Sequence, residues 1–427
     1  MTHRTLGRRP IAVAAVAALA LVMTPVVSSA ANSNNANAIK PLPISDAQLQ
    51  MMTTTMGGAS VQPTTRTIAH WWGSSLDPHN GVTYGYNMVG ADPNTCTGSA
   101  CSVTIQADIT PINVNVDGMT FSGSDVLGPT LASPQFALND YGSTTAASDS
   151  NKASGPGGPL SQADAGNLLQ LQDATMRAQF NKTGESGYHL RLSPNVLPAV
   201  TINVPSNEGT LLQSKRGVVF GDISIRWWVA QIQRLETKAD PTHLPIYLTD
   251  SVVLYYGSPL NCCVIGFHGA QAEANGGSTH TQGNAKVQTF AWASWARPGI
   301  AGDWALQDIH PLSHEIAEWA DDPFANNTAE PWVTPTALQY GCSAFLETGD
   351  PVVGIGFAMG TNGHDQSSPG ADGSYHPEDE VFLPWFMRTS PNGVSEPTQS
   401  ASANGGRYTL MGDLNPFAGF RQPATGC

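Results

Sequence analysis

Charged residues are scarce in this sequence: Asp, Glu, Lys and Arg make up 12% of its 427 residues. A globular domain usually carries about 25%, and a coiled coil or a long helical bundle needs still more Glu and Lys, so the composition excludes these two architectures. Basic residues are the scarcer kind, since 19 Lys and Arg stand against 33 Asp and Glu and leave a formal net charge of −14. Such an acidic surface repels phosphate backbones, so we expect no nucleic-acid partner.

Several common catalytic and binding motifs are missing. The sequence contains no Gly-x-Ser-x-Gly, the nucleophile turn of α/β-hydrolase esterases. It contains no Gly-x-Gly-x-x-Gly and no phosphate-binding Walker loop, so nucleotide binding has no support. An Asp-x-Asp-x-Asp-Gly calcium loop and a Cys-x-x-Cys zinc pair are also missing. Esterases of this type, nucleotide-dependent enzymes and Cys-ligated zinc proteins are therefore disfavoured.

The first 30 residues have the pattern of a signal peptide. A basic start with three arginines precedes the apolar stretch Ile11–Val27, and small residues at Ser28–Ala30 provide a cleavage site. The alternative is a membrane anchor, but Thr24 and Pro25 interrupt the stretch, which is shorter than the ~20 residues that a spanning helix needs. We therefore expect a secreted, extracellular protein that has no membrane association once residues 1–30 are removed.

The cysteines of an exported chain are expected to form disulfides. The sequence has six of them, which are Cys96, Cys101, Cys262, Cys263, Cys342 and Cys427. The first two enclose a four-residue loop that a local bridge could close. The adjacent pair is not expected to bond to itself, so each of its members would pair with one of the last two cysteines, in an order that the sequence leaves open.

Composition divides the chain into parts. Residues 31–65 are rich in Asn, Thr, Ser, Ala, Met and Gln, which is typical of a linker or a removable pro-segment. After it we expect a β-rich N-terminal region at 66–158, a catalytic core at 159–390 and a loop-rich tail at 391–427. Within the β-rich region, Val103–Val116 alternates apolar and polar residues and runs into the turn signal Asp117-Gly118.

Hydrophobic periodicity in the core predicts alternating strands and helices. Strands are expected at 200–204, 217–220, 244–256 and 286–295, and helices at 161–180, 225–235 and 305–320. This alternation predicts an α/β (α+β) fold, in which helices pack on a mixed sheet.

One segment of the core, Ser-His-Glu-Ile-Ala-Glu, carries catalytic chemistry in a helix that Pro311 opens and Pro323 ends. His314 and Glu318 lie four residues apart, so both side chains project from one helical face and can bind one metal ion. The usual zinc motif is His-Glu-x-x-His, whose inner Glu activates the bound water. Here Glu318 replaces the second His, and a carboxylate oxygen also ligates zinc. We therefore predict Zn²⁺ bound by His314 and Glu318, with Glu315 as the general base.

A third ligand is needed, and zinc sites of this class usually bring it from later in the chain. Glu347 is the favoured candidate and Asp350 the next, although Glu-Thr-Gly-Asp-Pro is also ordinary turn chemistry. His364 and His376 are weaker options. His268 follows a predicted strand and is an accessory candidate at the rim of the cleft, with a purely structural role as its alternative.

The motif resembles that of a group of exported bacterial proteins classed as zinc peptidases, and more distantly that of the plant exordium or phosphate-induced proteins. The segments that carry the resemblance are Ser313–Glu318 with Asp322-Pro323, Asp173–Phe180, Leu244–Thr249, Cys262–Gly269 and Glu347–Asp350. The resemblance implies a zincin-like mixed sheet with a metal-binding active-site helix, in which His314 and Glu318 are ligands and Glu315 is the base.

Two functions follow from these patterns. The first is a secreted zinc-dependent metallopeptidase that hydrolyses polypeptide bonds, with its substrate extended along an edge strand beside the metal helix. The second is a non-catalytic exported protein, associated with a surface or cell wall, that uses the same scaffold for binding. At the motif itself, the alternative is that its polar residues are surface residues of an amphipathic helix.

Overall fold

The computed structural model describes most of the chain between residues 40 and 410. The described residues are 40–45, 52–56, 58–61, 65–141, 168–180, 182, 187–273, 286–334, 342–389 and 408–410. The expected signal peptide and nearly all of the expected tail lie outside them. None of the described helices is long and apolar enough to cross a membrane.

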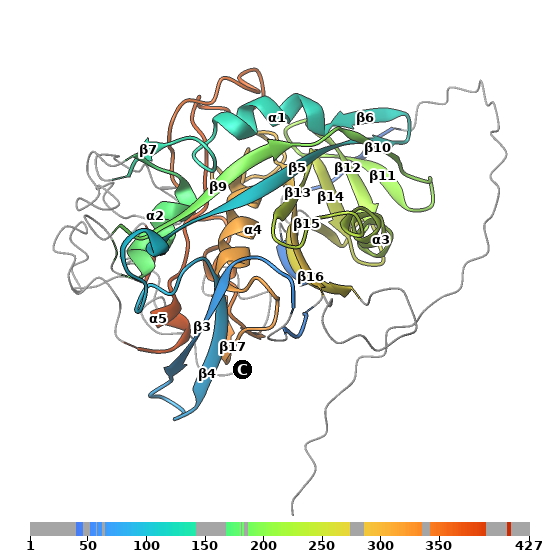
Figure 1. Ribbon diagram of the computed structural model, residues 1–427. Helices are drawn as coiled ribbons and strands as arrows, with labels where there is room; N and C mark the ends of the chain where they lie inside the picture. The colour runs from blue at the N-terminus through green and yellow to red at the C-terminus, as the bar shows by residue number, and fades with distance from the viewer. Residues whose placement is uncertain are drawn as a thin grey trace, which may run out of the picture. The chain divides into compact units, whose positions relative to one another are not determined.

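A mixed β-sheet lies at the centre of the described part (Figure 1). Its strand order is β1 (Leu42–Pro43), β11 (Gly209–Gln213), β12 (Val219–Ser224), β14 (Val252–Tyr255), β15 (Cys262–Glu273), β16 (Lys286–Trp295), β13 (Leu244–Asp250), β5 (Ser102–Val116) and β10 (Val200–Asn203). Three further strands join it, β2 (Met52–Met56) on β15, and β6 (Met119–Ser122) and β9 (His189–Val196) on β5. The pairs β5–β13 and β13–β16 are parallel, whereas β16–β15 and β15–β14 are antiparallel. The predicted mixed α/β fold is confirmed at this level.

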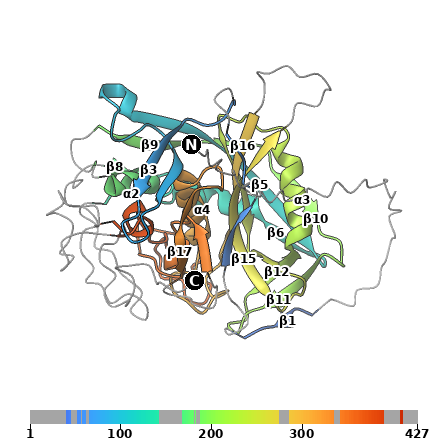
Figure 2. The same ribbon diagram turned by 90° about the horizontal axis from the view of Figure 1, so that it is seen from below.

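Helices cover both faces of the sheet (Figure 2). Helix α3 (Ile225–Glu236) packs on one face, and α4 (His310–Asp321) packs on the other against β15 and β16. Residues in β5 explain the two layers, because successive side chains point to opposite faces. Ile105 and Ile109 join a core that contains residues of α4, α1 (Gly123–Ala132) and α2 (Leu171–Gln179). Ile112 and Val114 join the core beneath α3.

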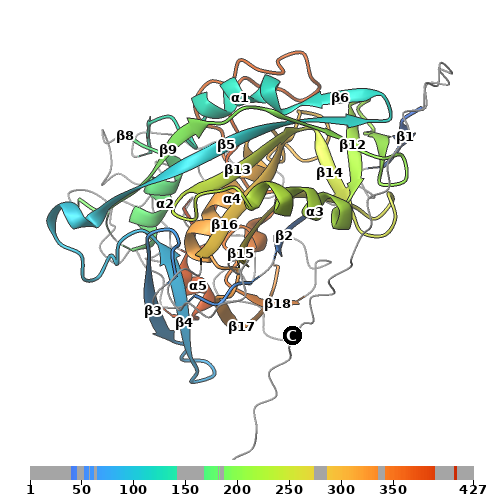
Figure 3. The ribbon, with the colours of Figure 1, turned by 45° about the vertical axis from the view of Figure 1, so that its right-hand side comes forward.

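Helix α4 is covered on the side away from the sheet as well, so every one of its residues is buried. A further apolar cluster contains residues of the hairpin β3 (His70–Leu76) and β4 (Thr83–Val89), of β17 (Thr328–Val333) and of α5 (Leu383–Phe386). These elements and β18 (Cys342–Phe345) lie together on the side away from α1 (Figure 3). The polar residues of α4 therefore lie between two packed layers.

Most predicted elements of the core form, with several shifts. The helix expected at 305–320 begins only at His310, and the strand expected at 217–220 lies at Val219–Ser224. The strand expected at 244–256 is split into β13 and β14, because Ser251 adopts a left-handed conformation with φ 52°. The helix expected at 161–180 begins only at Leu171, and Leu168–Leu169 form the short strand β8, which pairs with β7 (Asn139–Asp140). The capping pattern predicted for this helix at 161–164 lies outside the described residues.

The disulfides confirm one prediction and correct another. Cys96 and Cys101 are bonded, as the short loop between them predicts. Cys262 and Cys263 are bonded to each other, so the expectation that each would pair with a distant cysteine is wrong. The peptide bond between them is cis, and their Cα atoms lie only 3.0 Å apart, which lets the two sulfurs meet. Cys342 is also disulfide-bonded.

The burial of Asp222 on β12 can be tested by the pH dependence of the free energy of unfolding. Its carboxyl is fully buried with no hydrogen-bond partner among the described residues, and burial raises its pKa to about 9. Between the unfolded pKa of 3.8 and this value the folded state keeps a proton that the unfolded state has lost, so stability falls as pH rises. Relative to Asp222→Asn, the wild type should lose up to about 1.4 kcal/mol of unfolding free energy per pH unit. Urea unfolding at pH 5 and pH 8 measures this difference, and the exposed Asp125→Asn should show none.

Candidate metal centre

Helix α4 presents His314 and Glu318 on one face, as their four-residue spacing predicts. The helix begins at His310, has Pro311 in its first turn and ends at Asp321. The His314 Nε2 atom lies 2.9 Å from Glu318 Oε1, and both side chains are buried. The pair therefore offers one nitrogen and one carboxylate oxygen to the same ion.

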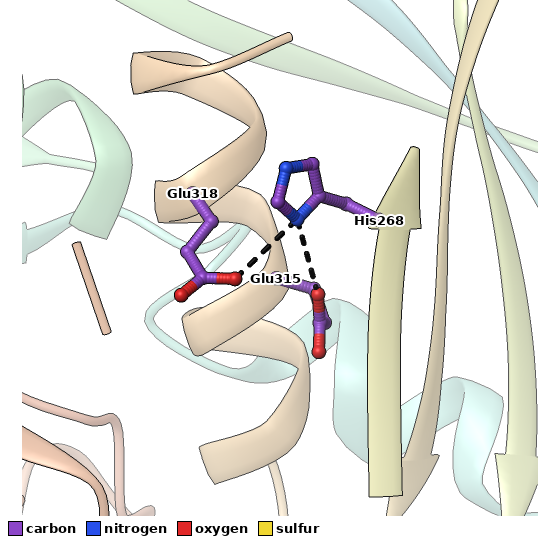
Figure 4. Close-up of side chains that lie close together, drawn as sticks. All are labelled: His268, Glu315 and Glu318. Carbon is purple, nitrogen blue, oxygen red and sulfur yellow. Dashed lines mark ion pairs between the residues drawn. The ribbon is translucent and has the colours of Figure 1, made fainter. Parts of the chain in front are cut away.

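Strand β15 brings a second imidazole, that of His268, to the carboxylates of α4 (Figure 4). Its Nδ1 atom lies 3.3 Å from Glu318 Oε2 and 3.5 Å from Glu315 Oε2. Residues two apart on a strand share a face, and both Gly266 and His268 face α4. His268 is fully buried, so it does not lie at a cleft rim as the sequence suggested.

The loop after β18 supplies the two favoured candidates for a third ligand, at different places. Asp350 Oδ1 lies 3.7 Å from His314 Nε2, and its side chain is 29% exposed. Glu347 is buried, and its Oε2 atom lies 3.8 Å from His268 Nε2. Asp350 therefore stands beside His314, whereas Glu347 stands beside His268.

Glu378 is the residue of this centre that the sequence did not indicate. Its carboxylate accepts a hydrogen bond from His314 Nδ1, and its other oxygen lies 3.3 Å from His310 Nε2. Its backbone N–H donates to the Ser313 hydroxyl, which fixes this loop to α4. Glu378 lies 64 residues after His314, in a run of acidic residues with no motif spacing, so only the fold reveals the contact.

Two glycines make room for these side chains. A Cβ atom at Gly266 would collide with the Glu315 carboxylate, and a Cβ atom at Gly349 would collide with the His314 ring. Neither position tolerates a larger residue without moving a member of the centre, so both segments pack on α4 through bare backbone.

The protein environment separates the acidities of the two glutamates on α4. Burial raises the pKa of Glu315 to about 8. Burial acts in the same direction on Glu318, but the charge of His314 and the contact with His268 outweigh it and lower the pKa well below its ordinary value. Neighbouring carboxyl groups whose pKa values are pushed apart can divide acid–base roles, with Glu318 ionised and Glu315 able to exchange a proton near neutral pH.

Several buried nitrogen and oxygen atoms that could ligate a metal have no hydrogen-bond partner within the described part of the chain. They include both ring nitrogens of His268, Nε2 of His314 and both carboxylate oxygens of Glu315. Such atoms are costly to bury unless something binds them. Two groups of three donors have their atoms within 4.8 Å of one another, namely His268, Glu315 and Glu318, and His314, Glu318 and Asp350. Imidazole and carboxylate donors in these groups fit a divalent cation such as Zn²⁺.

The weaker histidine candidates lie outside this centre. His376 Nδ1 lies 2.7 Å from Asp308 Oδ2, and His364 Nε2 lies 3.4 Å from Asp365 Oδ2. Neither belongs to the two donor groups.

Comparison of the chain with models of protein families, with curated proteins and with solved structures finds no match. The interpretation of the centre therefore depends on its geometry and on the motif on α4.

The contact between Glu378 and His314 can be tested by metal affinity. A carboxylate that orients a ligating imidazole typically contributes 10–100-fold to metal affinity, so Glu378→Gln should weaken zinc binding by about this factor. Competition with a chelator of known affinity measures the change. Glu380→Gln is the matched control, because Glu380 is equally buried in the same loop and its carboxyl makes no hydrogen bond to a histidine among the described residues. Equal affinities for the two variants would exclude the orienting role.

Proposed function

We propose that this chain is a secreted zinc-dependent peptidase that hydrolyses polypeptide bonds with a metal-activated water. The observation that carries the proposal is the buried arrangement on α4, where Glu378 binds His314 Nδ1 and leaves Nε2 facing Glu318. A carboxylate on the far nitrogen of a ligating imidazole is the usual arrangement at protein zinc sites. His314 and Glu318 would hold the ion, and Asp350 offers a further oxygen beside them.

A zincin-like reading of the fold supports this proposal, since the metal helix packs against one face of a mixed sheet. An extended polypeptide would pair with β15, the strand that carries His268. The chain's own strand β2 pairs in parallel with β15 over Val264–Gly269. A substrate would therefore reach this part of β15 only with β2 displaced, which agrees with a removable pro-segment at 31–65.

The residues of the centre divide the chemistry among them. Zinc bound here would polarise the scissile carbonyl and lower the pKa of a water molecule. Glu315 would accept the proton of that water and return it to the leaving amine. His268 lies 3.5 Å from Glu315 and would orient its carboxylate. Burial of both side chains strengthens these interactions, because little solvent screens them.

Closure of the centre favours the second function, a binding protein with a structural metal. A substrate reaches a buried centre less readily than an exposed one, and His268, His314, Glu315 and Glu318 are all at most 1% exposed. A separate cavity of about 790 Å³ is lined in part by Asn326, in the loop after α4, and by Trp72, whose side chain is largely exposed. If the protein is such a binding protein, its ligands bind at a surface such as this cavity, and the metal holds α4 and the elements packed on it together.

Metal content is the first test. Mass spectrometry of the purified mature protein should find about one zinc per chain. His314→Ala should reduce the zinc content to near zero, because His314 is the imidazole in the donor group of His314, Glu318 and Asp350. The exposed His79→Ala serves as the control and should keep its zinc. No metal in the wild type, even after zinc is supplied, would exclude both the peptidase and the structural-metal proposals.

Hydrolysis separates the two functions. Glu315→Gln should reduce cleavage of casein or of a peptide library by at least 10²-fold, since it removes the proton acceptor, while about one zinc per chain remains. A wild type that binds zinc but cleaves no peptide favours the binding protein. Cleavage by Glu315→Gln at the rate of the wild type would show that Glu315 is not the base.

A further inference from the structure

The two imidazoles of the centre are arranged alike around Glu318. For His314, one ring nitrogen binds the Glu378 carboxylate and the other lies 2.9 Å from Glu318 Oε1. For His268, one ring nitrogen lies 3.8 Å from Glu347 Oε2 and the other lies 3.3 Å from Glu318 Oε2. Each ring thus has one nitrogen beside an oxygen of Glu318 and the other beside a second glutamate.

Glu318 presents a different oxygen to each imidazole. The two groups of donors that lie within 4.8 Å of one another share Glu318 but contain one imidazole each. The group of His314 is completed by Asp350, and the group of His268 by Glu315. A carboxylate whose two oxygens face two separate donor groups is placed as a bridge between two ions, which in two-metal hydrolytic sites lie about 3.5–4 Å apart.

His268 supplies an observation that does not depend on the acidic residues. Its side chain is fully buried, and neither ring nitrogen has a hydrogen-bond partner in the described ranges. The ring points from β15 toward Glu315 and Glu318, as Figure 4 shows. A buried imidazole directed at two carboxylates without a hydrogen bond to either offers a lone pair to an ion between them.

We propose that Glu318 bridges two divalent cations, one bound by His314 and Asp350 and the other by His268 and Glu315. This inference rests on the metal centre proposed above but not on peptide hydrolysis. Glu378 orients the His314 ring through its hydrogen bond to Nδ1. Because Glu315 ligates the second cation, filling this position removes the proton acceptor, so the second cation inhibits hydrolysis by the one-cation form.

Cobalt titration of the metal-free full-length protein tests the proposal, with visible absorption and electron paramagnetic resonance as readouts. The wild type should take up two equivalents of Co²⁺, and the second should couple magnetically to the first. His268→Gln should take up one equivalent. Glu315→Gln should keep the first and bind the second at least about 10-fold more weakly, because it loses a ligand of the second cation. His243→Gln is the matched control, because this histidine also contacts a carboxylate, Asp108, and it should leave two equivalents.

The outcomes distinguish this proposal from the zinc centre itself. A wild type that saturates at one equivalent overturns the second cation and leaves the first in place. A wild type that binds no cobalt overturns the centre as a whole. Two equivalents in His268→Gln, checked for folding by circular dichroism, would place the second cation elsewhere. If that variant does not fold, an unchanged second binding step in Glu315→Gln overturns the proposal.

Discussion

The attraction between buried carboxylates and two buried imidazoles is the interaction on which the centre of this protein depends. Helix α4 is buried along its whole length, yet half of its residues are polar. An ionised group in such a place is stable only when it is paired, and Glu318 finds its partners in His314 and His268. Removing one imidazole would leave its carboxylate partner as an unpaired buried charge, so the two sides of the centre must assemble together.

The layers around α4 supply these partners from separate parts of the chain. The apolar residues of the helix, such as Ile316 and Trp319, join the core on the sheet and hold the helix in place. The sheet then contributes His268, and the C-terminal loops contribute Asp350 and Glu378 from the other side. Apolar packing therefore sets the position of the helix, and the polar contacts set the chemistry.

Much of the fold could be predicted because it follows from local periodicity. The alternation in β5, the turn at Asp117-Gly118 and the apolar stripe of α3 all appear where expected. Predictions failed where one residue or a distant contact changes the backbone. The left-handed Ser251 splits an apolar run that reads as one strand. Cys262 and Cys263 form a disulfide with each other that spacing alone would not suggest.

The sequence by itself determined the pair His314 and Glu318, because the rise and turn of a helix place residues four apart on one face whatever surrounds them. Tertiary structure decided the rest of the centre. Glu378 meets His314 across 64 residues, and the placing of Glu347 with His268 depends on how the loop after β18 packs on α4 and β15. Contacts of this kind arise when separate layers pack on one helix, and no spacing along the chain encodes them.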